Sequence, residues 1–204
     1  MSENIIDTIE QADVALSIEA GKLRDHPAVE AAGFVSEISD QEPAYALAAV
    51  ALATGLLAGR PRLAEGGGRA LLSIFLATRI KANIKAVVVR TRPHKLLDEG
   101  HYETGLNGPD ESDYNSFPSG HTADAVAAAR AIWRVAPEAA VPLTAAAAGI
   151  GLVQVPRARH HLADVIAGAV VGLVAEAAVD AIWHAARRLR DGRPASVRAG
   201  QDRG

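Results

Sequence analysis

The distribution of apolar and polar positions along the chain predicts helices, and no stretch shows the alternation typical of a strand. Residues 4–24 place apolar side chains among acidic ones in a loose amphipathic pattern. Glycines at 66–68 and prolines at 93 and 137 are expected to interrupt the helical pattern. The candidate helical segments are 4–24, 28–39, 43–59, 69–90, 121–135, 139–156 and 162–189. The predicted fold class is all-α, a bundle of five to six helices.

Composition changes this picture only in what it excludes. The 21 basic residues nearly balance the 24 acidic ones, so the net charge of −3 does not suggest a nucleic-acid partner. The chain contains no cysteine, which excludes disulfides, thiolate nucleophiles and cysteine-ligated metals. The uneven charge suggests three regions: an acidic N-terminal helical segment at 1–42, the helical bundle at 43–190, and a basic disordered tail at 191–204.

Two segments, 43–59 and 139–156, lack charged residues and just reach the length that spans a bilayer. The other candidate helices carry charges, which leaves a soluble protein as the alternative. Basic residues at 60–69 and 187–190 fall on one side when the helices alternate in direction, as the positive-inside rule requires. We therefore expect a protein that spans the membrane, with the end that carries Lys85 and Arg92 on the outer face.

Three clusters of polar residues interrupt the apolar background. Lys85 and Arg92, two turns apart, could converge on one anion, or they could be two cations that snorkel at a helix end. Ser119, Gly120 and His121 open a helix whose free N–H groups would face an anion, although an ordinary cap with a surface histidine fits as well.

The third cluster is His160 and Asp164, four residues apart. A carboxylate that holds one imidazole nitrogen leaves the other free as a nucleophile or base, whereas a simple surface pair is the alternative. A zinc site at His160 and His161 lacks a third ligand at suitable spacing. Together, the three clusters predict a site for phosphoryl transfer without a metal, at one end of the bundle.

Three motifs, Lys85-x6-Arg92-Pro93, Pro118-Ser119-Gly120-His121 and His160-x3-Asp164, carry a family resemblance. They resemble the signature motifs of the type 2 phosphatidic acid phosphatase superfamily, over residues 70–170. This superfamily includes membrane lipid phosphatases, soluble bacterial acid phosphatases and vanadium haloperoxidases. The haloperoxidases are usually much longer than this chain.

The resemblance implies a role for each matched residue. His160 would attack phosphorus to form a phosphohistidine, Asp164 would orient His160, and His121 would protonate the leaving oxygen. The groups implied to hold the phosphate oxygens are Lys85, Arg92, Ser119 and the Gly120 N–H. Water would then cleave the phosphoenzyme, with no divalent metal and no cofactor.

One position departs from the family pattern. The third motif usually carries an arginine six residues before the nucleophilic histidine, and here that position is Gln154. Gln154 can hydrogen-bond a phosphate but carries no charge, and Arg157 or Arg159 could replace the missing cation. The departure predicts reduced activity or an altered substrate, and the alternative is a catalytically weakened protein that binds phosphate or lipid.

The predicted function is therefore a metal-independent phosphatase acting on a phosphomonoester or pyrophosphate. The resemblance and the apolar helices suggest a lipid substrate: phosphatidic acid, phosphatidylglycerophosphate or undecaprenyl pyrophosphate. The expected location is the bacterial inner membrane, and the expected partners are the lipid phosphate, the membrane and a second copy in a homodimer.

Overall fold

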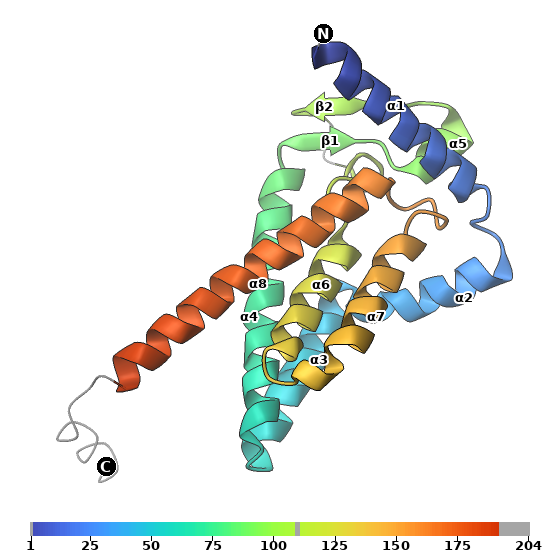
Figure 1. Ribbon diagram of the computed structural model, residues 1–204. Coiled ribbons are helices and arrows are strands. Elements are labelled where there is room, and N and C mark those ends of the chain that lie inside the picture. The colour runs from blue at the N-terminus through green and yellow to red at the C-terminus, as the bar shows by residue number, and fades with distance from the viewer. Residues whose placement is uncertain (1, 109–110, 192–204) are drawn as a thin grey trace.

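The computed structural model describes residues 2–108 and 111–191, and these form a helical bundle with a small hairpin at one end (Figure 1). The α-helices are α1 (Ser2–Gly21), α2 (Pro27–Ser36), α3 (Gln41–Leu57), α4 (Pro61–Lys85), α5 (Pro93–Glu99), α6 (Gly120–Trp133), α7 (Ala140–Val153) and α8 (Leu162–Asp191). The strands are β1 (Val88–Arg90) and β2 (Thr104–Leu106), and the 3-10 helices are η1 (Glu37–Ser39), η2 (Ser112–Tyr114) and η3 (Pro137–Ala139). The predicted all-α class is confirmed.

Helices α4, α6 and α8 pack against one another at the centre, α3 lies along α4, and α7 lies along α6 (Figure 1). Small side chains allow this packing. One core cluster consists almost wholly of alanines from α4, α6 and α8, joined by Val171. Glycines bring the backbones closer still: a Cβ at Gly168 or at Gly172 of α8 would lie 2.5 Å from a backbone oxygen of α6 or its cap. Small residues therefore set the spacing of the central helices.

We expect Gly168→Ala to lower the free energy of unfolding by about 1–3 kcal/mol, because the added methyl group meets the backbone oxygen of Ser119. Gly149→Ala on α7 is the matched control, because a Cβ there meets open space. This substitution also replaces a glycine inside a helix, but it introduces no clash. Thermal unfolding in detergent measures both variants. A Gly168→Ala protein that melts with the wild type would contradict this view of the packing.

Several charged residues of α4 and α8 turn inward and form ion pairs, whereas others such as Arg79 stay exposed. Glu176, 2% exposed, accepts hydrogen bonds from Nε (2.8 Å) and Nη2 (3.2 Å) of Arg134. Arg69, also buried, donates Nη1 to Asp180 at 2.7 Å. Pairing of this kind neutralises charges that would otherwise be costly to bury between the helices.

Three expectations about local structure are wrong. The glycines at 66–68 do not interrupt α4, because Gly67 lets the backbones of α3 and α4 meet closely: a Cβ there would lie 2.3 Å from the Leu52 nitrogen. The segment expected to be helical up to residue 90 leaves the helix at Lys85 and forms β1, which pairs antiparallel with β2. Pro93 begins a helix, α5, instead of ending one, since proline lacks only an N–H that the first turn does not use.

The N-terminal region, predicted as a separate segment at 1–42, contacts the bundle at the end that carries β1 and β2. Helix α1 packs on α5 and on the start of α8, and α2 packs on α7 (Figure 1). Asp13 and Ser17 of α1 accept hydrogen bonds from the first backbone N–H groups of α8, those of Ala163 (3.1 Å) and Leu162 (3.3 Å). These two side chains therefore cap α8 from another helix. The predicted tail at 191–204 lies outside the described residues, apart from Asp191.

Among the described residues, one helical stretch, Leu162–Arg190, is long and apolar enough to cross a membrane by length and composition. A core helix of a soluble protein can pass the same test. The two uncharged segments form α3, with 17 residues, and α7, with 14 residues. At 1.5 Å per residue, α7 extends about 21 Å, which is shorter than the hydrocarbon core of a bilayer.

Candidate active site

The three polar clusters of the sequence meet at one end of the bundle. Lys85 is the last residue of α4, Ser119 caps α6, and Asp164 lies in the first turn of α8. Arg92 precedes α5, and His160 precedes α8. In Figure 1 these helix ends lie together beneath the hairpin, at the end opposite the C-terminus of α8.

Asp164 is the fully buried centre of this group. Its Oδ2 accepts hydrogen bonds from the Ser116 hydroxyl at 2.5 Å and from the His161 backbone N–H at 2.8 Å. Its Oδ1 accepts a hydrogen bond from Nη1 of Arg90 at 2.6 Å. Asp164 is thus held as a carboxylate by a cation and two neutral donors.

His160 lies beside this carboxylate but donates elsewhere. Its Nδ1 is 2.7 Å from the Ser116 carbonyl oxygen and 3.7 Å from Oδ2 of Asp164. Because a carbonyl only accepts, Nδ1 carries the proton and Nε2 keeps its lone pair. Burial lowers the pKa of His160 to about 4; the nearby Asp164 opposes this shift, whereas Arg92 and Lys85 add to it. The imidazole is therefore neutral at pH 7, with Nε2 available as a nucleophile.

The cations Lys85 and Arg92 are held by carbonyl oxygens. Lys85 donates Nζ to the Asn115 carbonyl, and Arg92 donates Nε to the Ser112 carbonyl at 2.8 Å. Within residues 2–108 and 111–191, neither side chain forms an ion pair with a carboxylate closer than 4.0 Å. Burial and the charge of Arg159 lower the pKa of Arg92, so an anion that neutralises this charge would be stabilised.

The start of α6 completes this side of the site. Ser119 is an N-cap whose Oγ accepts from the Thr122 N–H at 3.5 Å and the Thr122 hydroxyl at 2.9 Å. Its own N–H donates to the backbone oxygen of Asp164 at 3.0 Å, which joins α6 to α8. Gly120 faces Lys81, whose Nζ would lie 3.4 Å from a Cβ at this position. The first turn of α6 therefore presents backbone N–H groups beside a lysine.

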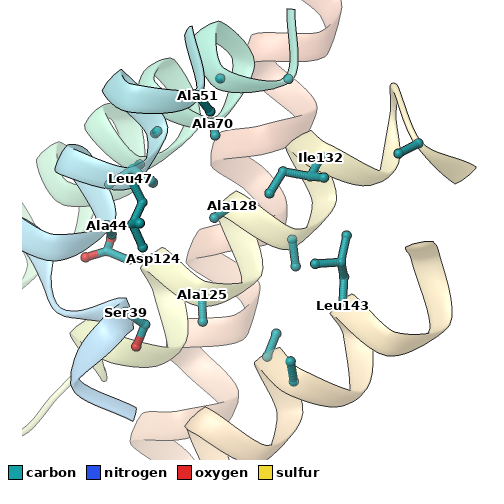
Figure 2. A pocket seen from close by; sticks show the side chains of 18 of the residues that line it. Ser39, Ala44, Leu47, Ala51, Ala70, Asp124, Ala125, Ala128, Ile132 and Leu143 are labelled. Atoms are coloured by element: carbon teal, nitrogen blue, oxygen red, sulfur yellow. The ribbon is translucent and has the colours of Figure 1, made fainter. Parts of the chain in front are cut away.

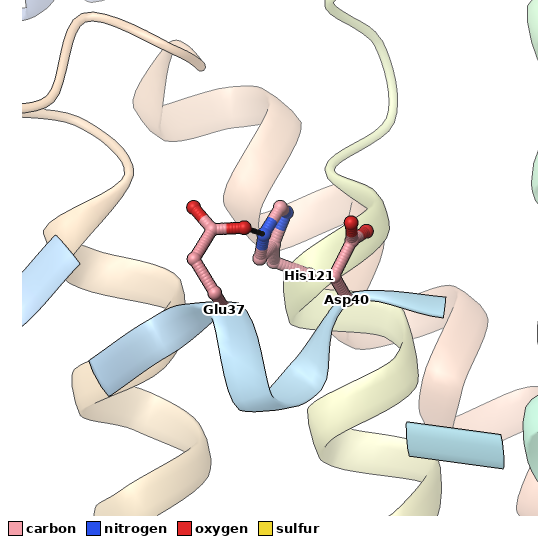
Figure 3. Close-up of side chains that lie close together, drawn as sticks. All are labelled: Glu37, Asp40 and His121. Atoms are coloured by element: carbon pink, nitrogen blue, oxygen red, sulfur yellow. Dashed lines mark hydrogen bonds and ion pairs between the residues drawn. The ribbon is translucent and has the colours of Figure 1, made fainter. Parts of the chain in front are cut away.

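His121, the next residue, contacts an element that the sequence placed outside the bundle. Its Nε2 is 3.3 Å from Oε2 of Glu37 in η1 (Figure 3). The other carboxylate oxygen of Glu37 accepts from Nη2 of Arg157 at 2.5 Å. Burial would raise the pKa of Glu37, but the hydrogen bonds from Arg157 and His121 hold it below its usual range.

Gln154, at the position of the family's arginine, is fully buried. Its amide donates to Ser36 Oγ at 3.1 Å and to the Ile150 carbonyl at 3.0 Å. Arg157 donates to the same Ser36 oxygen at 3.0 Å, and Arg159 is exposed beside Arg92. Gln154 and Arg157 thus hold α2, and Arg159 is the arginine whose charge reaches Arg92.

The sequence reasoning missed three residues of this site: Arg90, Ser116 and Glu37. Arg90 stands two residues before Arg92, and Ser116 stands two residues before the second motif, so both lay close to recognised signals. No sequence pattern marked Glu37 as a site residue, because nothing in the sequence places residue 37 beside residue 121.

Two groups of histidines and carboxylates in the described structure could suggest a metal site, and we interpret neither of them as one. His161 turns away from His160: its Nε2 lies 3.0 Å from the Thr91 carbonyl oxygen, and its ring packs edge-on against Tyr102. Glu37, Asp40 and His121 bring three potential ligand atoms within 4.8 Å of one another (Figure 3). Arg157 already supplies positive charge to Glu37, so we interpret this group as an ion-pair network.

Comparison with known proteins places this fold and site in a family. The family model of the PAP2 superfamily matches residues 66–188, more than half of the chain, and the chain belongs to this superfamily. By class the protein is a phosphatase. A comparison with curated proteins finds no match.

Two solved structures share the fold. The crystal structure of Aquifex aeolicus LpxE is 20% identical, with a TM-score of 0.59, and the match covers 81% of this chain and 92% of that one. The transmembrane PAP2-type phosphatidylglycerolphosphate phosphatase from Bacillus subtilis is 19% identical, with a TM-score of 0.59, and the match covers 87% of each chain. The family indicated by the three motifs is confirmed.

Proposed function

We propose that the protein is a metal-independent phosphatase that hydrolyses a lipid phosphomonoester or pyrophosphate through a phosphohistidine at His160. The observation that carries the proposal is the neutral, buried imidazole whose Nδ1–H is held by a carbonyl. Its free Nε2 lies in a pocket of positive charge from Lys85 and Arg92, as attack on a phosphate requires.

The reaction takes two steps. Nε2 of His160 attacks phosphorus, the bond from phosphorus to the leaving oxygen breaks, and protonated His121 gives that oxygen its proton. Water then attacks the phosphohistidine, neutral His121 takes a proton from this water, and the electron pair of the N–P bond returns to Nε2. Lys85, Arg92, the Ser119 hydroxyl and the Gly120 N–H stabilise the charge on the phosphate oxygens throughout.

A lipid substrate is supported by an apolar cavity of about 550 Å³ between α3, α4, α6 and α7 (Figure 2). Its walls include Leu47, Ile132 and Leu143, and it begins at Asp124 and Ala125, one helical turn beyond His121. A hydrocarbon chain could lie there while its phosphate reaches the site. The solved relative from Bacillus subtilis is described as a phosphatidylglycerolphosphate phosphatase, which agrees with this substrate class.

Membrane insertion is supported by the apolar surface of the bundle. Large apolar side chains on α3, α7 and α8 are exposed, among them Leu57, Val141 and Ile166. Patches of this kind are rare on soluble monomers. Arg187 of α8 pairs with Glu65 near the start of α4, so both basic segments lie at the end away from the site. We therefore place the site at the outer face of the bacterial inner membrane.

The experiment that tests the function is phosphate release by the detergent-solubilised protein in EDTA. Phosphatidic acid and undecaprenyl pyrophosphate are the substrates, and His160→Ala and Gln154→Arg are the variants. Release by the wild type that is lost in His160→Ala is the expected result. A silent wild type with activity gained in Gln154→Arg would instead identify a weakened relative that binds phosphate or lipid.

The pKa of His160 predicts the pH dependence of the reaction. Because this pKa lies near 4 rather than 6.5, Nε2 stays unprotonated down to about pH 4, and kcat/KM should fall only below that pH. Arg92→Gln removes a cation that lowers this pKa, so it should move the acid limb to higher pH. The measurement is kcat/KM from pH 3.5 to 8, and an acid limb near 6.5 in the wild type would contradict the neutral, buried nucleophile.

A further inference from the structure

Glu37 is the feature that the proposed reaction does not yet use. It opens η1, between α2 and α3, and lies outside the residues 66–188 that match the superfamily. Figure 3 shows its carboxylate turned toward the imidazole of His121. The two residues are 84 positions apart in the chain, so the contact depends entirely on how α2 and η1 are docked.

That docking is built from buried contacts. Ser36, 1% exposed, accepts hydrogen bonds from Gln154 and Arg157 and donates to the Gly33 carbonyl at 2.7 Å. Gly33 has no Cβ, and one built there would lie 2.6 Å from Nε of Arg157. The end of α2 therefore fits against the connection between α7 and α8, and the residue after Ser36 is carried to a fixed place.

The two oxygens of the carboxylate have distinct partners. Oε1 binds the permanent cation Arg157, which keeps Glu37 ionised, and Oε2 accepts from Nε2 of His121. Burial lowers the pKa of His121, and the hydrogen bond to Glu37 and the charge of Asp40 oppose this shift. The carboxylate therefore stabilises the imidazolium relative to a buried histidine without such a partner, and it leaves Nδ1 as the second proton-bearing nitrogen. The other charged groups around His121 are Asp40 beside it, Arg157, and the Lys81–Asp124 pair of α4 and α6.

We propose that Glu37 is a positioning residue that orients His121 and stabilises its imidazolium form, so that Nδ1–H can protonate the leaving oxygen. This inference rests on the proposed phosphatase reaction. When Nδ1 gives its proton to the leaving oxygen, the neutral ring keeps its Nε2–H bond to Glu37. Nδ1 is then ready to take the proton of the water that cleaves the phosphohistidine. The Gln154 that departs from the family pattern acts here as an anchor for this arrangement.

The test compares Glu37→Gln with Glu30→Gln, an exposed carboxylate on α2 that serves as the matched control. In Glu37→Gln we expect kcat for phosphatidic acid to fall on the order of 10-fold to 100-fold, with KM little changed. The alkaline limb of the kcat profile should move to lower pH, because the imidazolium loses its counter-charge. Glu30→Gln should match the wild type in all three quantities.

Activity on substrates with different leaving groups distinguishes a role of Glu37 in proton transfer from a purely structural role. With p-nitrophenyl phosphate, whose leaving group departs without protonation, Glu37→Gln should lose much less activity than with phosphatidic acid. Glu37→Asp keeps the charge but shortens its reach, so it should show the same selective loss to a smaller degree. Glu37→Asp also replaces Glu37→Gln in this experiment if the glutamine variant does not fold.

Three results would overturn the proposal. Equal losses on both substrates with an unchanged alkaline limb would make Glu37 purely structural. A lower KM with unchanged kcat would mean that the carboxylate competes with the phosphate for Arg157 and His121. Loss of wild-type activity in EDTA, restored by Zn²⁺ or Mn²⁺, would make the cluster a metal site. Failure of the phosphatase proposal itself would show separately, as no release by the wild type or as release that persists in His160→Ala.

Discussion

Arg90→Met is expected to lower the free energy of unfolding by about 3–5 kcal/mol, because it leaves buried carboxylates without their cation. The guanidinium of Arg90 is 4% exposed and binds Asp164 at 2.6 Å, Asp13 at 2.7 Å and Glu10 at 3.0 Å. Its Nε also donates a hydrogen bond to the hydroxyl oxygen of Tyr102 at 3.1 Å. One side chain thus joins α1, the hairpin and the start of α8, and methionine keeps its bulk but not its charge.

Thermal unfolding in detergent measures this effect, and a fall in Tm on the order of 10 °C is expected. Arg79→Met, an exposed arginine on α4, is the control and should change Tm little. The difference in Tm between Arg90→Met and the wild type should become smaller at acid pH, because protonation there removes the unpaired charge of the carboxylates. A variant that melts with the wild type at pH 7 would show that Arg90 does not hold this group together.

His160→Ala is expected to reduce kcat for phosphate release by about 10⁴-fold or more, since it removes the only atom proposed to bond to phosphorus. The remaining cations would still bind the substrate, so KM should change far less than kcat. Protein labelled with a radioactive phosphate substrate and quenched in base should carry a phosphohistidine in the wild type and none in the variant.

The control for this variant is His101→Ala, an exposed histidine before β2 that contacts neither Asp164 nor Ser116 in the described structure. It should retain both activity and labelling. Residual activity of His160→Ala above about 1% of the wild type would place the nucleophile elsewhere. Its natural substitute would be His121, and a His121→Ala variant would then lose the phosphoenzyme instead.

The local chemistry of the site was readable from the sequence wherever it depends on neighbours in the chain. A serine at a helix start caps that helix, so the role of Ser119 at the start of α6 followed from local rules. His160 and Asp164 are four residues apart, and the structure places Nδ1 and Oδ2 of this pair 3.7 Å from each other. The expectation that Asp164 orients His160 directly did not anticipate the Ser116 carbonyl, which takes the Nδ1 proton.

Helix boundaries were less accessible, because tertiary contacts override local preference. The glycines at 66–68 have poor helix propensity, yet α4 runs through them since Gly67 fits against the backbone of α3. Val88 and Val89 continued the apolar pattern of the preceding helix, but pairing with β2 makes residues 88–90 a strand. Local propensity differs by less than about 1 kcal/mol per residue, so contacts of this kind decide the outcome.

By itself, the sequence determined the all-α class, the superfamily and the residues of its three motifs, because each depends on periodicity or on short spacing. Only the tertiary structure decided which distant groups meet them: Arg90 at Asp164, and Glu37 at His121. It also decided that Gln154 faces Ser36, so that the departure from the motif anchors α2. Contacts between residues 70 to 120 positions apart arise from helix packing, and no local pattern of the chain predicts how the helices pack.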